Sequence, residues 1–336
     1  MPHHKILVVA PSWVGDAVLA QPLFRRLHQR FPGLALDVLA PPWVAAVFER
    51  MAEVNEILLS PFRHGGLDIA QRWKFGRSLA NKGYEQAIVL PNSWKSALIP
   101  FFAGISLRTG FIGELRFGLL NDARPAEKKH YASMVKCFAL LGEPRGTKPQ
   151  TAFANPSLQV PPGQREDTLK SMGLTTQKAV AVFCPGAEYG PAKRWPTKYF
   201  AELAKRLENY QVWLIGSAND RSIGEEIHQL SGGVAMNLCG KTSLAQAIEL
   251  LSCASLVVSN DSGLMHIAAA LDKPMLALYG SSSPAFTPPL SEHAQVLKLD
   301  LPCSPCFQRV CPLGHFNCMM QLTPDVVLAK IGVKKP

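Results

Sequence analysis

The sequence predicts an α/β protein built from two Rossmann-like halves, and three observations carry this prediction. The length of 336 residues fits two domains of ordinary size. Short apolar runs alternate with segments of helical periodicity, which is typical of parallel sheets covered by helices. A strand–loop–helix–strand pattern opens the chain and returns after a stretch rich in Pro, Gly and Thr.

The first half opens with a short apolar strand, Lys5–Ala10. Ala17–Phe31 then places its apolar residues on one face of a helix, which Pro32 and Gly33 end. Leu34–Leu39 is the next predicted strand. Later in this half we expect a strand at Ala87–Leu90, a Gly-rich basic segment at Thr109–Leu120, and helices at Ser93–Phe102 and Tyr131–Leu141.

The second half repeats this alternation after a linker. Gly142–Gly163 has little periodicity, so we place the domains at 1–160 and 161–336. Two such halves imply a cleft, with ligands at the carboxyl ends of the strands. The predicted strands are Ala179–Cys184, Val212–Ile215, Leu256–Ser259 and Pro274–Tyr279, and the predicted helices are Thr197–Leu207, Ala245–Leu251, the segment from Gly263 through Leu271, and Thr323–Ile331.

The composition bounds the classes of function. Hydrophobic residues make up 47% and charged residues 18%, as in a globular chain. Lys and Arg total 35 against 25 Asp and Glu, so the net charge of +10 favours an anionic partner. No long basic run is present, which disfavours nucleic acid. No signal-peptide pattern or membrane-spanning apolar run is visible, so we expect a cytoplasmic protein that can rest on a membrane face.

Three loops carry residues suited to chemistry. Asp16 lies where a strand ends and a helix begins, as a carboxylate base or as a helix N-cap. The loop after Cys184 contains Gly186 and the cation Lys193, which suit a diphosphate; a solvated loop is the alternative. The third loop follows another apolar strand and begins a helix, so its amides form a phosphate site; its residues are Asp261, Ser262, Gly263 and His266. Asp261 is also a possible cap, and burial is the favoured reading of His266.

Four cysteines lie close together near the C-terminus, with His315 among them: Cys303, Cys306, Cys311 and Cys318. Their spacing does not match a common zinc finger or ribbon, so free thiols that brace the domain edge are favoured over a metal site.

Several segments together resemble the ADP-heptose:lipopolysaccharide heptosyltransferases, which are inverting glycosyltransferases of the GT-B fold. The resemblance covers nearly the whole chain. The Cys-rich tail is similar to the type II enzymes more than to type I. The other matching segments are Pro-Ser-Trp-Val-Gly-Asp-Ala-Val at 11–18, Leu-Pro-Asn-Ser-Trp-Lys-Ser-Ala at 90–97, Arg-Thr-Gly-Phe at 108–111, the loop 185–196, and Ser-Asn-Asp-Ser-Gly-Leu-Met-His at 259–266.

The resemblance implies two domains facing a central cleft, with a C-terminal helix that returns to the first domain. Residues 1–160 would bind the acceptor, heptosyl-Kdo2-lipid A, and residues 161–336 the donor, ADP-heptose. Asp16 matches the family's catalytic base, and Lys193 its donor-phosphate lysine. Asp261, Ser262, Gly263 and His266 match the donor loop, and Asp220 falls near an acidic residue that contacts the ribose.

The acceptor and the cofactor follow from the same resemblance. The acceptor carries phosphates and carboxylates, so basic residues of the first half are candidate acceptor or membrane contacts, with ordinary surface charge as the alternative. Neither half contains Asp-x-Asp, so we expect no metal or other cofactor. A GT-B enzyme for another nucleotide sugar and a zinc-stabilised nucleic-acid binder are the competing predictions. The candidate contacts are Ser12, Lys95, Arg108, Arg116, Arg124, Lys128 and Lys129.

Overall fold

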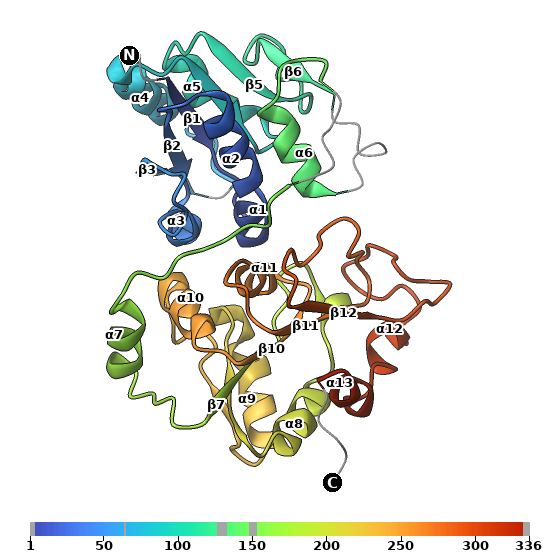
Figure 1. Cartoon of the computed structure of the whole chain (residues 1–336). Helices are drawn as coiled ribbons and strands as arrows, with labels where there is room; N and C mark the ends of the chain where they lie inside the picture. The colour runs from blue at the N-terminus through green and yellow to red at the C-terminus, as the bar shows by residue number, and fades with distance from the viewer. Residues whose placement is uncertain (1–3, 64, 126–132, 148–152, 332–336) are drawn as a thin grey trace. The chain divides into compact units, whose positions relative to one another are not determined.

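The computed structural model describes residues 4–63, 65–125, 133–147 and 153–331 (Figure 1). The chain divides into two compact units, Met1–Ala154 and Asn155–Pro336. Each unit contains one six-stranded sheet in which every strand pair is parallel. The α/β prediction is therefore confirmed.

The sheet of the first unit has the order β3-β2-β1-β4-β5-β6. This is the doubly wound order, in which the chain reverses direction between the neighbours β1 and β4. The strands are β1 (Lys5–Val9), β2 (Ala35–Ala40), β3 (Glu56–Leu59), β4 (Gln86–Val89), β5 (Leu107–Phe111) and β6 (Asp122–Arg124). The helices are α1 (Val14–Leu19), α2 (Gln21–Arg30), α3 (Pro42–Phe48), α4 (Ile69–Leu79), η1 (Ala80–Lys82), α5 (Trp94–Phe102) and α6 (Met134–Leu141).

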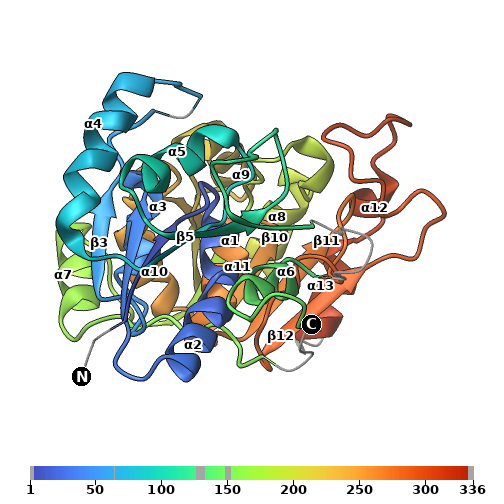
Figure 2. The ribbon, with the colours of Figure 1, turned by 90° about the horizontal axis from the view of Figure 1, so that it is seen from above.

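Helices cover both faces of this sheet because successive strand residues point to opposite faces. Leu7 and Val9 of β1 share one core cluster with residues of α4 and α5. In this cluster the two helices approach closely at Gly76, where a Cβ would lie 2.7 Å from the Cβ of Phe102. Figure 2 shows α4 and α5 together, apart from α2 and α6, which contact each other.

Two predicted helices of this unit have different bounds in the structure. The single helix expected over Ala17–Phe31 is wrong, because α1 ends at Leu19 and α2 begins at Gln21. Pro22 explains the break, since proline has no N–H to donate to the preceding turn. The helix expected from Tyr131 begins at Met134, after the N-cap Ser133, and residues 131 and 132 lie outside the described residues.

The second unit repeats the strand order of the first, with β12-β11-β10-β7-β8-β9 and a reversal between β7 and β10. Its strands are β7 (Ala179–Cys184), β8 (Tyr210–Leu214), β9 (Ala235–Asn237), β10 (Leu256–Asn260), β11 (Met275–Tyr279) and β12 (Ala294–Lys298). Its helices are α7 (Gln164–Ser171), η2 (Pro191–Lys193), α8 (Thr197–Arg206), η3 (Ala218–Asp220), α9 (Arg221–Leu230), α10 (Leu244–Ser252), α11 (Gly263–Ala270), α12 (Asn317–Met320) and α13 (Pro324–Ile331).

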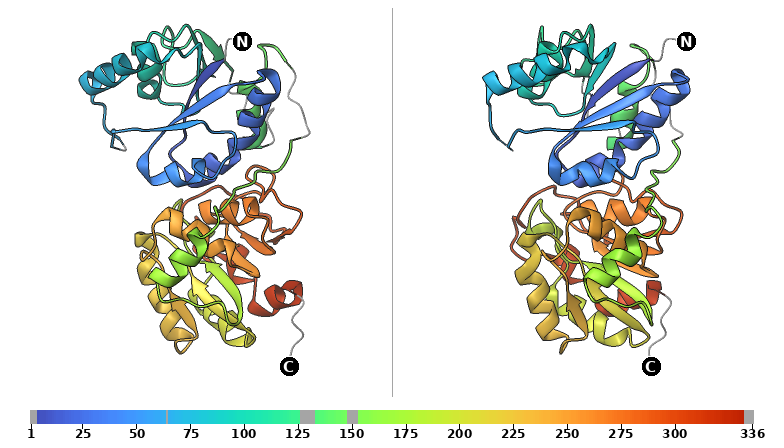
Figure 3. Two further views of the ribbon diagram at one scale, coloured as in Figure 1. Left: turned by 60° about the vertical axis from the view of Figure 1, so that its left-hand side comes forward. Right: turned by 90° about the vertical axis from the view of Figure 1, so that its left-hand side faces the viewer.

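The core of the second unit joins its strands to α8, α9 and α13, with Trp195 and Phe200 among the largest buried side chains. Helices α10 and α11 contact each other, and both are orange in the two views of Figure 3. Helix α13 packs on α8 and β11 and so belongs to this unit, whereas the resemblance implied a C-terminal helix that returns to the first domain. Among the described residues, every helix is too short or too polar to cross a bilayer.

Candidate functional site

The reversal point of the second sheet brings two predicted loops together. Strands β7 and β10 are direct neighbours, so the loops that leave their carboxyl ends lie side by side. The fully buried amide of Asn260 joins them. Its Nδ2 donates to the carbonyl of Pro185 at 2.7 Å, and its Oδ1 accepts from the backbone N–H of Trp195 at 3.0 Å. A single side chain therefore holds both ends of the loop that contains Lys193.

Lys193 and Asp261 form an ion pair at this point. Lys193 ends the short helix η2, and its Nζ donates to Oδ2 of Asp261 at 2.6 Å. The Asp261 side chain is 4% exposed and that of Lys193 is 17% exposed. A carboxylate this deeply buried requires a close cation, because desolvation of an unpaired charge is costly. Within this pair, the Lys193 ammonium is thus the more exposed partner and the Asp261 carboxylate the more buried one.

The start of α11 supplies hydrogen-bond donors beside this pair. Ser262 is the extended N-cap residue and Gly263 the first helical residue, and no side chain caps this helix. The first N–H groups of a helix have no partner within it, and they favour anions. Lys193 and these amides together form a candidate phosphate site, in agreement with the predicted loop.

His266 lies one turn into α11 and is buried. Burial lowers its pKa to about 4; the Asp261 carboxylate raises it and the Lys193 ammonium lowers it further. The imidazole is therefore neutral at pH 7. This burial agrees with a packed histidine, and a contact with the donor stays a prediction.

Gly186 and Asp220 also lie together, after β7 and β8. A Cβ on Gly186 would lie 2.4 Å from the carboxylate of Asp220, so only glycine fits there. Asp220 Oδ2 accepts from the backbone N–H of Ser217 at 2.9 Å and from its hydroxyl at 2.7 Å. Asp220 Oδ1 is buried and has no hydrogen-bond partner among the described residues. One oxygen thus caps a helix, and a ribose contact through Asp220 stays a prediction.

In the first unit, Asp16 and Lys95 belong to the helices that follow β1 and β4, the two strands at the reversal point. Asp16 is the third residue of α1, and the N-cap is Trp13, so the N-cap alternative for Asp16 is wrong. The carbonyl of Ser12 accepts from Nε1 of Trp43 at 3.0 Å. The helix starts thus carry Asp16 and Lys95 at the sheet edge where ligands of such folds bind.

The arginines expected as acceptor contacts direct their guanidinium groups into the fold. Arg108 donates to the carbonyls of Leu119 and Ile105 at 2.7 and 2.6 Å. Arg116 is 3% exposed and donates to the carbonyls of Pro91, at 2.6 Å, and Phe111. Backbone contacts therefore account for both side chains.

Arg124 is buried in an ion pair with Asp122, at 2.6 Å, so the expectation that it is a surface contact is wrong. Its guanidinium also donates to the carbonyls of Leu140 and Glu143. Lys128 and Lys129 lie outside the described residues.

Comparison with known proteins identifies the family. The family model described as glycosyltransferase family 9 (heptosyltransferase) matches residues 72–317. The chain belongs to this family of heptosyltransferases. Lipopolysaccharide heptosyltransferase 2 of Escherichia coli K12 is 45% identical over 98% of this chain and 97% of its own length. Lipooligosaccharide heptosyltransferase 2 of Haemophilus influenzae is 41% identical, with 98% of both chains covered. The solved structure of the E. coli ADP-heptose lipopolysaccharide heptosyltransferase II superimposes with a TM-score of 0.87 at 43% identity, covering 98% of this chain and 97% of that one.

The four clustered cysteines of this glycosyltransferase are free thiols. Within the described part of the chain, no group of three or more His, Cys, Asp or Glu side chains is arranged to hold a metal. Burial raises the pKa of Cys318, whereas backbone N–H groups, first that of Phe316, lower the pKa of Cys311. The segment that contains these cysteines is hydrogen-bonded to the loop that contains Lys193.

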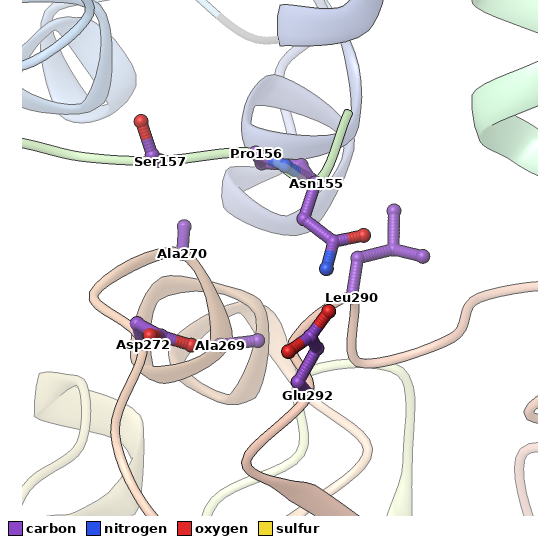
Figure 4. A pocket seen from close by; sticks show the side chains of 8 residues that line it. All are labelled: Asn155, Pro156, Ser157, Ala269, Ala270, Asp272, Leu290 and Glu292. Atoms are coloured by element: carbon purple, nitrogen blue, oxygen red, sulfur yellow. The ribbon is translucent and has the colours of Figure 1, made fainter. Parts of the chain in front are cut away.

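A hollow of about 260 Å³ lies near the amino ends of β11 and β12 in the second sheet (Figure 4). It is lined by the end of α11 and by residues that precede β11 and β12, with Asp272 and Glu292 among them. It contains none of the predicted site residues, because those follow the carboxyl ends of the strands.

Sequence reasoning missed Asn260, which holds the loop that contains Lys193. The signal for Asn260 is a lone amide at the end of the apolar run Leu256–Val258. A polar side chain buried in such a place needs hydrogen-bond partners, and here these are the carbonyl of Pro185 and the N–H of Trp195.

Proposed function

We propose that this heptosyltransferase transfers L-glycero-D-manno-heptose from ADP-heptose to heptosyl-Kdo2-lipid A, with inversion at the anomeric carbon. The observation that carries the proposal is the pairing of Lys193 with the uncapped start of α11 at a reversal point of strand order. The names of the relatives support the choice of donor and acceptor, because they are lipopolysaccharide and lipooligosaccharide heptosyltransferases.

The second unit holds the donor in this proposal. During transfer, the bond between the heptose C1 and the β-phosphate oxygen breaks, and its electron pair stays on that oxygen. Lys193 and the amides of Ser262 and Gly263 face the growing negative charge. Donors fixed in advance at such a place stabilise the transition state more than the ground state. Gly186 and Asp220 lie toward β8, where we propose that the adenosine end binds.

Asp16 is the proposed general base. The attacking hydroxyl of the acceptor heptose gives its proton to the Asp16 carboxylate as its oxygen bonds to C1, and ADP leaves from the opposite side. Asp16 lies in the first turn of α1, where the positive end of a helix favours a negatively charged side chain. The cation at Lys193 and the helix start supply the charge stabilisation that a metal gives in other enzymes, so we expect transfer without a metal.

The first unit binds the acceptor in this proposal. It contains 19 Lys and Arg against 11 Asp and Glu, whereas the second unit contains 16 against 14. The basic excess of the chain is therefore concentrated in the unit that would meet the phosphates and carboxylates of the acceptor. Ser12 and Lys95, both half-buried at the sheet edge, remain the candidate contacts.

We also propose that the first unit rests on the cytoplasmic face of the inner membrane through an apolar loop. Leu115 is 85% exposed and Phe117 is 71% exposed, in the loop between β5 and β6 (Figure 1). The buried guanidinium of Arg116, between them, ties the loop to the carbonyls of Pro91 and Phe111. Glu114 adds a second tie, because its carboxylate accepts from the N–H of Trp94 at 3.1 Å. The loop thus presents two large apolar side chains from a fixed base, as membrane-surface segments do.

The test is heptose transfer from ADP-heptose to heptosyl-Kdo2-lipid A by the purified chain, with and without EDTA, beside Asp16→Asn. We expect turnover that EDTA leaves unchanged, and a loss of roughly 10²–10⁴-fold in Asp16→Asn, because a general base contributes about that much. Binding of ADP should be the same in both proteins.

Other outcomes separate the parts of the proposal. A chain that prefers UDP- or GDP-sugars in a competition assay would replace the donor and keep the fold. A chain that binds ADP-heptose but fails with this acceptor would overturn the acceptor alone. Full activity in Asp16→Asn would remove Asp16 as the base.

A further inference from the structure

The segment between β12 and α12 is fastened on both sides at the carboxyl edge of the second sheet. On the side of β11, the N–H of Phe307 donates to the carbonyl of Ser281 at 2.6 Å. On the side of the loop that contains Lys193, the hydroxyl of Tyr189 donates to the carbonyl of Phe307 at 2.8 Å. The N–H of Ala192, next to Lys193, donates to the carbonyl of Arg309 at 3.0 Å. These bonds fix the backbone of Arg309 beside the proposed diphosphate lysine.

Gly190 shows how close the two segments approach. A Cβ at this position would lie 2.4 Å from the carbonyl oxygen of Arg309, and the glycine has a φ of 156°. Any side chain at position 190 would push the segment of Arg309 away from the loop that contains Lys193. This close contact therefore depends on the glycine, and it fixes the position from which the Arg309 side chain extends.

Two cationic side chains lie over the ring of Tyr189. Nζ of Lys193 lies 5.2 Å from the ring centroid, and Cζ of Arg309 lies 5.1 Å from it. Arg309 is exposed, and its guanidinium makes no hydrogen bond within the described part of the chain. The aromatic face thus holds a second cation near Lys193 while its N–H donors stay available to an anion.

The strand order indicates which phosphate Arg309 meets. Along the carboxyl edge the order is β8, β7, β10 and then β11. Asp220 follows β8, the Lys193 loop follows β7, α11 follows β10, and the segment of Arg309 is tied to Ser281 after β11. A donor with its ribose near Asp220 and its diphosphate at Lys193 and α11 extends its β-phosphate and heptose toward Arg309.

We propose that Arg309 is a second donor-binding cation, which hydrogen-bonds the β-phosphate of the nucleotide sugar. The inference rests on the proposed function and names a further contact in the same site. Arg309 takes no proton and forms no covalent bond in this role. Its planar guanidinium pairs with two phosphate oxygens, one of which receives the electron pair of the breaking C1–O bond.

The experiment compares ADP with AMP, since only ADP has the β-phosphate. Dissociation constants of both nucleotides are measured by calorimetric titration for the native chain, Arg309→Gln, Arg309→Lys and Tyr189→Leu. Arg165→Gln is the matched control, because Arg165 is an exposed arginine on α7 that pairs with Glu166. Thermal unfolding of each variant confirms that it is folded.

For Arg309→Gln we expect ADP to bind about 10- to 100-fold more weakly, as for loss of a charged hydrogen bond, while AMP binding is unchanged. Arg309→Lys should lose less affinity for ADP, because it keeps the positive charge but not the geometry for pairing with two oxygens. Tyr189→Leu should also weaken the binding of ADP more than that of AMP, since it removes the aromatic ring that holds Arg309.

Two results would overturn the inference while leaving the proposed function intact. One is an ADP affinity in Arg309→Gln equal to that of the native chain and Arg165→Gln. The other is an equal loss for ADP and AMP, which would indicate a general disturbance of the loop. A native chain that binds neither nucleotide would instead overturn the proposed function, and the inference with it.

Discussion

The ammonium of Lys193 lies 2.6 Å from the carboxylate of Asp261, and the two residues come from loops that follow different strands. This pair has two roles that can be separated. It keeps a buried carboxylate neutralised, which affects folding, and in the proposed function it also holds a cation ready for the donor diphosphate. The first prediction separates these roles.

Lys193→Gln should lower the free energy of unfolding by about 1–3 kcal/mol, because it leaves the buried Asp261 carboxylate without its hydrogen-bonded cation. The double variant Lys193→Gln/Asp261→Asn should recover most of that loss but none of the affinity for ADP. Urea denaturation and calorimetric titration measure the two effects. If the double variant were no more stable than Lys193→Gln, the pair would have no role in neutralising Asp261.

Asn260→Asp should damage the loop that contains Lys193, although the side chain keeps its size. The carboxylate can still accept from the N–H of Trp195, but its second oxygen would face the carbonyl of Pro185 without a donor between them. We expect a loss of about 2 kcal/mol or more in unfolding free energy and weaker binding of ADP. The exposed Asn209 offers a control, since Asn209→Asp should change stability by less than about 0.5 kcal/mol. Equal effects at the two positions would contradict this role for Asn260.

His266 should make stability depend on pH. Burial lowers its pKa to about 4, whereas an unfolded histidine titrates near 6.5. Between these values the unfolded chain binds more protons than the folded one. The contribution of His266 to the free energy of unfolding is therefore complete above pH 6.5 and falls as the pH drops toward 4. At pH 5 the loss is about 2 kcal/mol relative to pH 7.5.

The variant His266→Gln isolates this effect in urea denaturation at the two pH values. Between pH 7.5 and pH 5, the free energy of unfolding of this variant should fall by about 2 kcal/mol less than that of the native chain. The exposed His293 is the matched control, so His293→Gln should follow the native chain. An unchanged pH dependence in His266→Gln would show that other groups cause the acid loss.

Leu115→Ser/Phe117→Ser should weaken binding to vesicles that contain anionic phospholipid by about tenfold or more, because it removes two exposed apolar side chains. Transfer to an acceptor embedded in vesicles should fall, while transfer to a deacylated acceptor in solution should not. Leu230→Ser/Val234→Ser removes two exposed apolar residues of the second unit and serves as control. Equal vesicle binding by both double variants would remove the loop from the membrane contact.

Much of the fold follows from the sequence because the central strands are continuous apolar runs between turn residues. Ala179–Cys184 is both predicted and observed with the same bounds. The edge strands were missed for a physical reason. β9 has three residues and β3 has four, none of them fully buried in β3, so each run is too short to predict a strand by itself, and pairing with a neighbour defines them.

The candidate site divides in a similar way. Small polar residues after a buried strand predicted the start of α11 correctly, because that is a local signal. The burial of Arg116 between exposed Leu115 and Phe117 inverts the usual preference of these residue types. Only the tertiary position of the Pro91 and Phe111 carbonyls explains it, and no local pattern contains that information.

The identical strand order of the two sheets has a consequence for how such an enzyme changes over time. In the proposed function, the proposed base and the donor-phosphate lysine follow the first strand of their respective halves, and each half has its own core. Under the proposed function, a substitution in the second half that alters the choice of sugar nucleotide is therefore expected to leave the core of the first half unchanged. Donor and acceptor preference can drift independently, and exchange of one half between relatives is expected to exchange one preference at a time.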